Sequence, residues 1–146
     1  MAVFYRVATL HDSEALAILL PDLGYTASCD DVLTRLSIVL SDTRHAIFVA
    51  EYNCTVIGMC HVTEVRNIAS SGYAEILEIV VASAHQGQGI GKHLLKSAEK
   101  WAAVRLFSRV RLRSGVHRSE AHQFYEKLGY EKMRASFAFE LQLAKF

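Results

Sequence analysis

The sequence predicts an α/β protein in which a mixed, mostly antiparallel central sheet carries helices on both faces. Short runs rich in β-branched and aromatic residues, typical of strands, alternate with longer segments whose apolar residues recur at helical spacing. A glycine-rich turn from Gly87 to Gly91 joins a buried strand to one of these helices. The expected order of elements is β-α-α-β-β-β-α-β-α-β, an arrangement that packs helices onto a sheet.

The composition is that of one globular domain without a strong preference for charged partners. Of the 146 residues, 51% are apolar and 21% are charged, and the net charge is +1. We therefore expect a single domain over residues 1–146 that does not recruit nucleic acid or an anionic membrane. The apolar runs are shorter than a membrane span of ~20 residues. The absence of a secretion signal and of metal-ligand cysteine spacing favours a cytoplasmic protein with no metal.

The N-terminal half predicts a strand, two helices and a hairpin. Residues 3–8 have the composition of a first strand. Asp12 or Ser13 can cap a helix whose apolar residues lie within 15–20, and Ser28 begins a capping box before an apolar stripe within 32–40. Residues 46–51 and 55–62 are β-rich runs on either side of a turn, which indicates a hairpin.

The C-terminal half predicts three further strands and two helices. Residues 74–81 are apolar on both faces, as is typical of a central strand. The glycine turn then begins a helix, and residues 109–113 alternate like a half-exposed strand. Residues 120–128 predict a helix that ends at Gly129. A final strand is expected from apolar residues that alternate with other types, namely Phe137, Phe139, Leu141 and Leu143.

The glycine turn has features suited to binding phosphate. Its free N–H groups, together with the dipole of the helix that follows, form a site for an anion. Glycines allow phosphates to approach the backbone and accept φ above zero. The spacing of Gly87, Gly89 and Gly91 does not fit the G-x-G-x-x-G turn of dinucleotide-binding folds. It does not fit a P-loop either, which has four residues between its glycines.

Two separated motifs resemble those of the GNAT superfamily of N-acetyltransferases. Gln86-x-x-Gly89-x-Gly91 is similar to the Q/R-x-x-G-x-G/A signature that binds the pyrophosphate of acetyl-CoA in that family. Ala121-x-x-Phe124-Tyr125-x-x-x-Gly129-Tyr130 is similar to the A-x-x-F-Y-x-x-x-G-[FY] pattern of a later helix. Because the order of elements also agrees, the resemblance covers nearly the whole chain. It implies the GNAT fold, acetyl-CoA as co-substrate and acetylation of a primary amine.

The resemblance also implies where acetyl-CoA binds. The pantetheine arm would lie in a splay between the strand ending at Val81 and the strand at 109–113. Backbone groups there, free where two strands separate, would hold the amides of the arm. The residues implied on the strand are Ile79, Val80 and Val81. Those implied at the turn are Gln86, Gly87, Gln88, Gly89, Ile90, Gly91 and Lys92.

Two residues are the candidates for proton transfer. Tyr125 matches a tyrosine that in many relatives donates a proton to the departing thiolate, and a phenol of pKa ~10 is protonated at pH 7. Its alternative role is that of a packed aromatic residue beside Phe124, which we expect in the core. Glu78 is the candidate base, because carboxylates on this strand accept the amine proton in several relatives. A structural ion pair is the alternative for Glu78, and Glu75 and His61 are the second and third candidate bases.

Three functions remain open from the sequence alone. A small-molecule amine acetyltransferase leads, because the region around Tyr125 is loosely similar to acetyltransferases of aminoglycosides and aminoalkylphosphonates. A non-catalytic acyl-CoA-binding regulatory module and a protein or peptide N-acetyltransferase are the alternatives. Arg118 replaces an asparagine that is common in relatives. Its side chain has two possible roles, a contact with a CoA phosphate or a solvated position at the start of the helix. The alternating C-terminal strand is compatible with a homodimer.

Overall fold

A computed structural model describes residues 2–144, which form two units, the first ending at Arg113 and the second starting at Ser114. The elements of the first unit are β1 (Phe4–Val7), α1 (Ser13–Leu19), α2 (Cys29–Leu40), β2 (His45–Tyr52), β3 (Thr55–Val65), β4 (Tyr73–Val81), α3 (Ile90–Val104) and β5 (Val110–Leu112). In the second unit, the described residues contain one helix, α4 (Ser119–Lys127). Among the described helices, none is long and apolar enough to cross a membrane.

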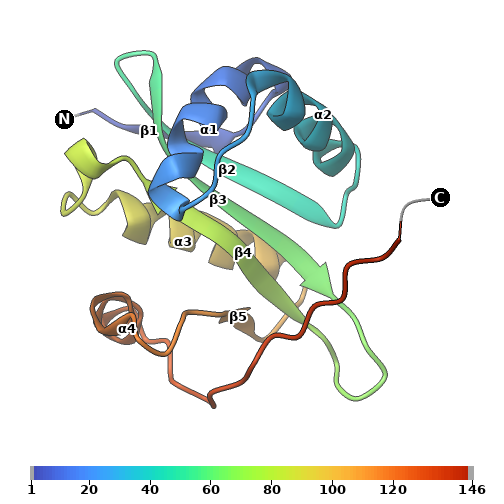
Figure 1. The fold of residues 1–146 in the computed structure, drawn as a ribbon. Coiled ribbons are helices and arrows are strands. Elements are labelled where there is room, and N and C mark those ends of the chain that lie inside the picture. The colour runs from blue at the N-terminus through green and yellow to red at the C-terminus, as the bar shows by residue number, and fades with distance from the viewer. Residues whose placement is uncertain (1, 145–146) are drawn as a thin grey trace. The chain divides into compact units, whose positions relative to one another are not determined.

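The five strands of the first unit form one sheet in the order of the sequence, from β1 to β5 (Figure 1). Strands β1 to β4 pair antiparallel, and β5 pairs parallel to β4. The parallel pair is connected through α3, as a parallel crossover requires. The predicted mixed and mostly antiparallel sheet is therefore confirmed.

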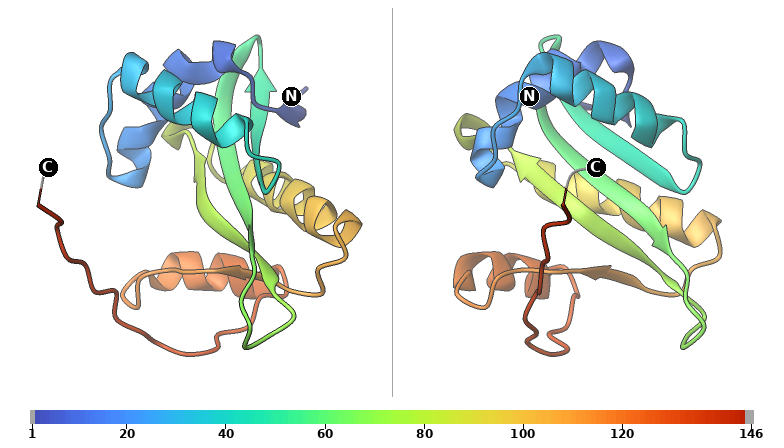
Figure 2. Two further views of the ribbon diagram at one scale, coloured as in Figure 1. Left: turned by 90° about the vertical axis from the view of Figure 1, so that its right-hand side faces the viewer. Right: turned by 45° about the vertical axis from the view of Figure 1, so that its right-hand side comes forward.

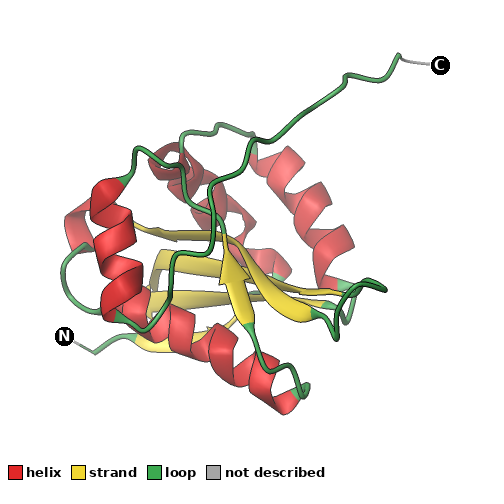
Figure 3. Cartoon of the chain, turned by 90° about the horizontal axis from the view of Figure 1, so that it is seen from below, coloured by secondary structure: helices red, strands yellow, loops and turns green. Residues whose placement is uncertain are grey.

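Helices cover both faces of this sheet, as predicted. Figure 2 shows α1 and α2 on one side of the strands and α3 on the other, and Figure 3 shows the same layers from below. Against α1 and α2 the sheet buries Ile47, Val49, Met59 and Val80. Each buried side chain of this size contributes ~1.5–3 kcal/mol to folding.

The other face of the sheet carries small residues where α3 crosses it. A Cβ added at Gly58 would lie 3.2 Å from Leu94 Cδ1, so this strand position permits close approach of the helix. Leu94 and Leu95 are fully buried in the layer between α3 and the sheet. Next along this face of β3, Cys60 is also fully buried, and burial raises the pKa of its thiol to about 12. This thiol is therefore an apolar packing group.

A β-bulge in β4 changes which side chains share a face. His61 pairs with Glu78 and Val62 pairs with Ile76, so Leu77 is an extra residue without a partner on β3. A regular strand places Ile76 and Glu78 on one face, as their spacing predicts. The bulge corrects this prediction, because cross-strand partners share a face and the adjacent residues His61 and Val62 face opposite sides. Glu78 therefore shares its face with His61, while Ile76 points to the side of α3.

The second unit differs from prediction at its C-terminal end. The structure assigns no strand to residues 128–144, so the tenth element of the predicted order does not form among the described residues. Four apolar side chains expected on that strand are between 80% and 95% exposed, namely Phe137, Phe139, Leu141 and Leu143. Alternation gives a segment one apolar face, but a strand also needs a hydrogen-bonded neighbour, and this segment has none in its unit.

Candidate active site

The turn between β4 and α3 has the backbone that its glycines predict. Gly87 and Gly89 have φ of 78° and 81°, in the left-handed region that side chains disfavour. A Cβ added at either position would meet no atom within 4 Å, so packing does not require a glycine there. The conformation requires it, and the open space in front of the turn is available to a ligand.

The start of α3 presents backbone donors beside this open space. Gly89 is the residue before the helix, and the N–H of His93 donates to its carbonyl at 3.2 Å. The N–H groups of Ile90, Gly91 and Lys92 precede this first helical bond and have no intrahelical acceptor. The Ile90 side chain is 2% exposed and anchors the helix start in the core. The site therefore combines a fixed backbone with donors suited to an anion.

The side chain of Gln86 binds the end of β4 rather than extending into solvent. Its Nε2 donates to the Val81 carbonyl at 3.1 Å. This bond closes the loop over the short 3-10 turn at Ser83–His85. Gln86 thereby fixes the geometry of the turn, and its bond occupies one of the two acceptor positions of the Val81 carbonyl.

Strands β4 and β5 separate where the resemblance implies that they do. Their pairing covers only Ala74 to Ile76, whose last partner is Leu112. From Leu77 to Val81, β4 has no partner on that edge among the described residues. Half of the backbone N–H and C=O groups of this stretch point to the open edge and are free to bind amides. The residues present therefore fit a pantetheine arm along β4 and a pyrophosphate at the turn.

Glu78 lies in the separated part of β4 and contacts a histidine. Its Oε1 is 3.8 Å from Nδ1 of His61, and its side chain is 38% exposed. His61 is buried and its Nε2 is 2.9 Å from Nδ1 of His45 on β2. The structure thus joins two of the three candidate bases. It also adds His45, which the sequence analysis missed.

The third candidate base, Glu75, has a different environment. It lies in the part of β4 that pairs with β5, opposite Arg111. Its Oε1 is 3.8 Å from Nε of Arg113, and its side chain is 17% exposed. A structural ion pair is therefore a sufficient role for Glu75.

Tyr125 lies on α4 in the second unit. Its ring contacts Phe124 and Tyr130 edge-on, with centroids 5.3 Å and 6.1 Å apart. Phe124 is 37% exposed, so its predicted place in the core is not found. The helix has no buried residue, because its short unit offers little surface to pack against. Arg118 is the residue before this helix, and its carbonyl accepts a bond from the His122 N–H at 3.1 Å.

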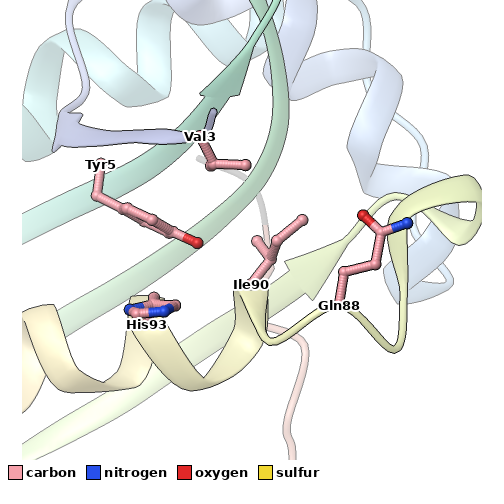
Figure 4. Close-up of a pocket in the computed structure, with 5 residues that line it drawn as sticks. All are labelled: Val3, Tyr5, Gln88, Ile90 and His93. Carbon is pink, nitrogen blue, oxygen red and sulfur yellow. The ribbon is translucent and has the colours of Figure 1, made fainter. Parts of the chain in front are cut away.

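A pocket of about 510 Å³ lies at the opposite edge of the sheet, beside β1. Figure 4 shows its lining: Val3 and Tyr5 from the β1 region, Gln88 from the turn, and Ile90 and His93 from α3. The rings of Tyr5 and His93 are 5.1 Å apart, and burial raises the pKa of Tyr5. No lining residue comes from β4 or β5. The chemistry implied at Glu78 is therefore not assigned to this pocket.

The described residues contain no group of three or more His, Cys, Asp or Glu side chains that could hold a metal ion.

Comparison with known proteins identifies the family. The sequence profile of the acetyltransferase (GNAT) family matches residues 11–130, well over half of the chain. The chain therefore belongs to the GNAT family of acetyltransferases, and the prediction from the two motifs is confirmed.

Two proteins with similar sequences are named as N-acetyltransferases. An uncharacterized N-acetyltransferase of Methanocaldococcus jannaschii is 37% identical over 58% of this chain, which spans only 38% of that protein. The uncharacterized N-acetyltransferase YhdJ of Bacillus subtilis is 26% identical over 77% of this chain and 80% of its own length.

Solved structures show the same fold. The aminoglycoside N-acetyltransferase AAC(6')-Iy in complex with CoA has a TM-score of 0.86 at 16% identity, over 97% of this chain and 96% of that one. The same enzyme in complex with the bisubstrate analogue CoA-S-monomethyl-acetylneamine has a TM-score of 0.85 at 16% identity, over 98% of this chain and 100% of that one. At these identities the similarity shows the fold alone.

Proposed function

We propose that this protein transfers the acetyl group of acetyl-CoA to a primary amine of a small molecule. The observation that carries the proposal is the continuous run from the free edge of β4 to the donors of α3, with Glu78 on the same strand. One face of this run fits an extended amide-bearing arm and its end fits a pyrophosphate. Family membership and the CoA-bound structural relative support the same donor.

The binding residues have separate tasks in this proposal. Backbone groups of Ile79, Val80 and Val81 hold the pantetheine amides along β4. The turn residues Gln86, Gly87, Gln88 and Gly89 shape the space for the pyrophosphate. The backbone donors of Ile90, Gly91 and Lys92 neutralise its charge, supported by the dipole of α3. Acetyl-CoA supplies the activated acyl group.

Glu78 is the proposed base. An amine reacts only after its ammonium form loses a proton, and a carboxylate at the free part of β4 is in a position to accept it. Its exposure of 38% leaves it accessible to a substrate or to an intervening water. Glu75 is a weaker candidate, because its carboxylate already lies beside Arg113.

Tyr125 is the proposed proton donor to the departing thiolate. The proposal rests on its place in the second family motif and on the chemistry of a protonated phenol. The profile match from 11 to 130 runs continuously across the boundary at Arg113. This continuity supports the proposal that both units belong to one domain.

Two further features of the proposal concern the state of the protein. Its three cysteines, Cys29, Cys54 and Cys60, are free thiols, which supports a reducing, cytoplasmic location. The exposed apolar residues between Phe137 and Leu143 support self-association into a homodimer.

A turnover screen tests the proposal. Thiol release from acetyl-CoA is measured with a panel of aminoglycosides, polyamines, amino acids and short peptides with free N-termini. Turnover with a small amine supports the proposal, and turnover confined to peptides assigns a protein or peptide N-acetyltransferase. Thermal stabilisation by acetyl-CoA without turnover on any amine would leave a non-catalytic acyl-CoA-binding module. A ligand at 100 times its Kd stabilises by about 2.7 kcal/mol, which such a measurement resolves.

A further inference from the structure

Four ionisable side chains form a continuous series across three strands of the sheet. Glu78 Oε1 is 3.8 Å from His61 Nδ1, and His61 Nε2 is 2.9 Å from His45 Nδ1. At the far end, His45 Nε2 is 3.9 Å from Asp42 Oδ2. We name these four residues, Glu78, His61, His45 and Asp42, the histidine relay.

The relay is most shielded at His61 and more open at its other members. The side chain of His61 is 10% exposed, against 38% for Glu78, 25% for His45 and 29% for Asp42. Access of bulk water to the relay is therefore lowest at His61. The two carboxylates, by contrast, reach solvent at different places, one at the free part of β4 and one in the turn before β2.

A threonine beside His45 indicates which ring nitrogens carry the protons. Thr63 Oγ1 lies 3.2 Å from the Arg44 carbonyl and 3.4 Å from the Glu64 carbonyl, and its one proton is donated to a carbonyl. Its oxygen is then left to accept from Nε2 of His45 at 3.4 Å. A neutral His45 protonated at Nε2 has a lone pair on Nδ1, which accepts from Nε2–H of His61. His61 then presents the lone pair of Nδ1 to Glu78. In this arrangement Nδ1 of both rings accepts a hydrogen bond or proton, and Nε2 of both rings carries the proton.

The surroundings of His45 favour the neutral state of its ring. Burial, the neighbouring His61 and the cation of Arg44 lower the pKa of His45, and Asp42 opposes them. Arg44 also holds the pKa of Asp42 at about 2, so this carboxylate is ionised at neutral pH. On the remaining side, Glu78 is the carboxylate in contact with His61, and Glu75 lies opposite Thr63.

We propose that His61 and His45 carry the proton taken up by Glu78 to water at the surface beside Asp42. The proposal rests on the proposed function, since it needs an amine that loses a proton to Glu78. The N–H bond of the ammonium breaks and an O–H bond forms on Glu78, whose proton passes to His61 Nδ1. The Nε2 proton of His61 then passes to His45 Nδ1, and the Nε2 proton of His45 leaves to water beside Asp42. Both rings end neutral in the opposite tautomer.

The relay is needed only while substrates cover Glu78. After product release, water reaches both ends, and the reverse shift of protons restores the first tautomers. The two contacts with carboxylates are about 1 Å longer than hydrogen bonds, so transfer there uses side-chain rotation or one bridging water. His61 and His45 act through Glu78 and are positioning residues for the proton path.

The kinetic test compares variants with the active wild-type enzyme. His45→Gln keeps a side chain capable of hydrogen bonding but is unable to pass a proton. We expect its kcat to fall about tenfold or more below the pKa of the amine, with KM values and Tm close to wild type. Because the links act in series, the His45→Gln and His61→Gln double variant should lose no more than the larger single loss. His11→Gln, an exposed histidine outside the relay, is the matched control.

Two controls keep the result interpretable. If His45→Gln lowers Tm, the surface variant Asp42→Asn tests the outer end without touching the core, with a smaller loss expected in the same pH range. Imidazole in the buffer should restore turnover to His45→Gly, which a purely structural role would not produce. A Glu78→Gln variant without a kinetic defect would reject the proposed base itself. A defect in Glu78→Gln together with an unchanged pH profile in His45→Gln would reject the relay alone.

A second measurement needs no substrate. Nitrogen-15 NMR of the imidazoles in the free protein reports which nitrogen is protonated. We expect both His61 and His45 to be protonated at Nε2 at neutral pH. Protonation of His61 at Nδ1, with its Nε2 as the acceptor, would leave no lone pair on Nδ1 to accept the proton of Glu78 and would overturn the proposal.

Discussion

Replacement of Gly89 by glutamate tests the anion site by charge. Any non-glycine residue at φ 81° costs ~1–2 kcal/mol, so both Gly89→Glu and the neutral Gly89→Gln should lower Tm by about 3–6 °C. No atom lies within 4 Å of the added Cβ, so neither variant should clash. A carboxylate ~6 Å from a phosphate charge costs about 2–3 kcal/mol at an effective dielectric of ~20. The Kd of CoA should therefore rise ~30–100-fold in Gly89→Glu beyond its rise in Gly89→Gln.

Isothermal titration calorimetry with CoA measures this difference in folded protein. The neutral variant carries the same bulk and the same backbone cost, so it isolates the charge. The difference should shrink at high salt, because salt screens exposed charges. Equal affinities in the two variants would refute the placement of the pyrophosphate at this turn.

The remaining predictions concern proton transfer and acid stability. Glu78→Gln should lower turnover mainly below the pKa of the amine while calorimetry shows near-native CoA binding; a larger loss in Glu75→Gln would contradict the base assignment. Tyr125→Phe should lower turnover ~10²–10⁴-fold with little change in Tm, and full turnover would remove its acid role. The hydrogen bond from Arg6 holds the pKa of the buried Asp12 below its usual value. Its contribution is present above the unfolded pKa and lost as pH falls through the folded one. Denaturant titrations below about pH 4 should therefore show a shallower loss of stability in Asp12→Asn, and parallel curves would exclude this role.

Local patterns were enough to predict the elements of the first unit and the turn at the candidate site. The conformations of Gly87 and Gly89 follow from residue type, because glycine tolerates positive φ and few other residues do. The start of α3 follows from the helical stripe that comes after them. Such features depend on residues that are close in the sequence, so they can be predicted from the sequence alone.

The contact between the side chains of His45 and His61 depends on a β-bulge that no sequence pattern predicts. Counting back from the hairpin turn without irregularity places Ala46 opposite His61, and His45 then faces the other side. A bulge between Ala50 and Glu51 shifts the register by one residue, so that Ile47 lies opposite His61. His45 thereby reaches the same face. The composition of the two strands does not indicate this shift in register. The contact between His45 and His61 is therefore found only in the structure.

The C-terminal segment shows a different limit. The alternation of Phe137, Phe139, Leu141 and Leu143 predicts a face, but a pattern within one segment does not specify the strand that would pair with it. The structure describes these side chains as exposed. Likewise, the motif around Phe124 predicted a helix correctly but not the burial of its aromatic residue, which depends on what the helix packs against.

The bulge at Leu77 keeps the edge of β4 free but lowers the stability of the protein. It follows Ile76, the last residue of β4 that pairs with β5, and bulges bend the strand that contains them. Deletion of Leu77 would keep every cross-strand partner between β3 and β4 while removing the bend. A straighter β4 would allow further pairing along β5 and would close the free edge. The expected product is a protein that melts at a higher temperature and no longer binds CoA, because the bulge lowers stability while it keeps the edge of β4 free for the ligand.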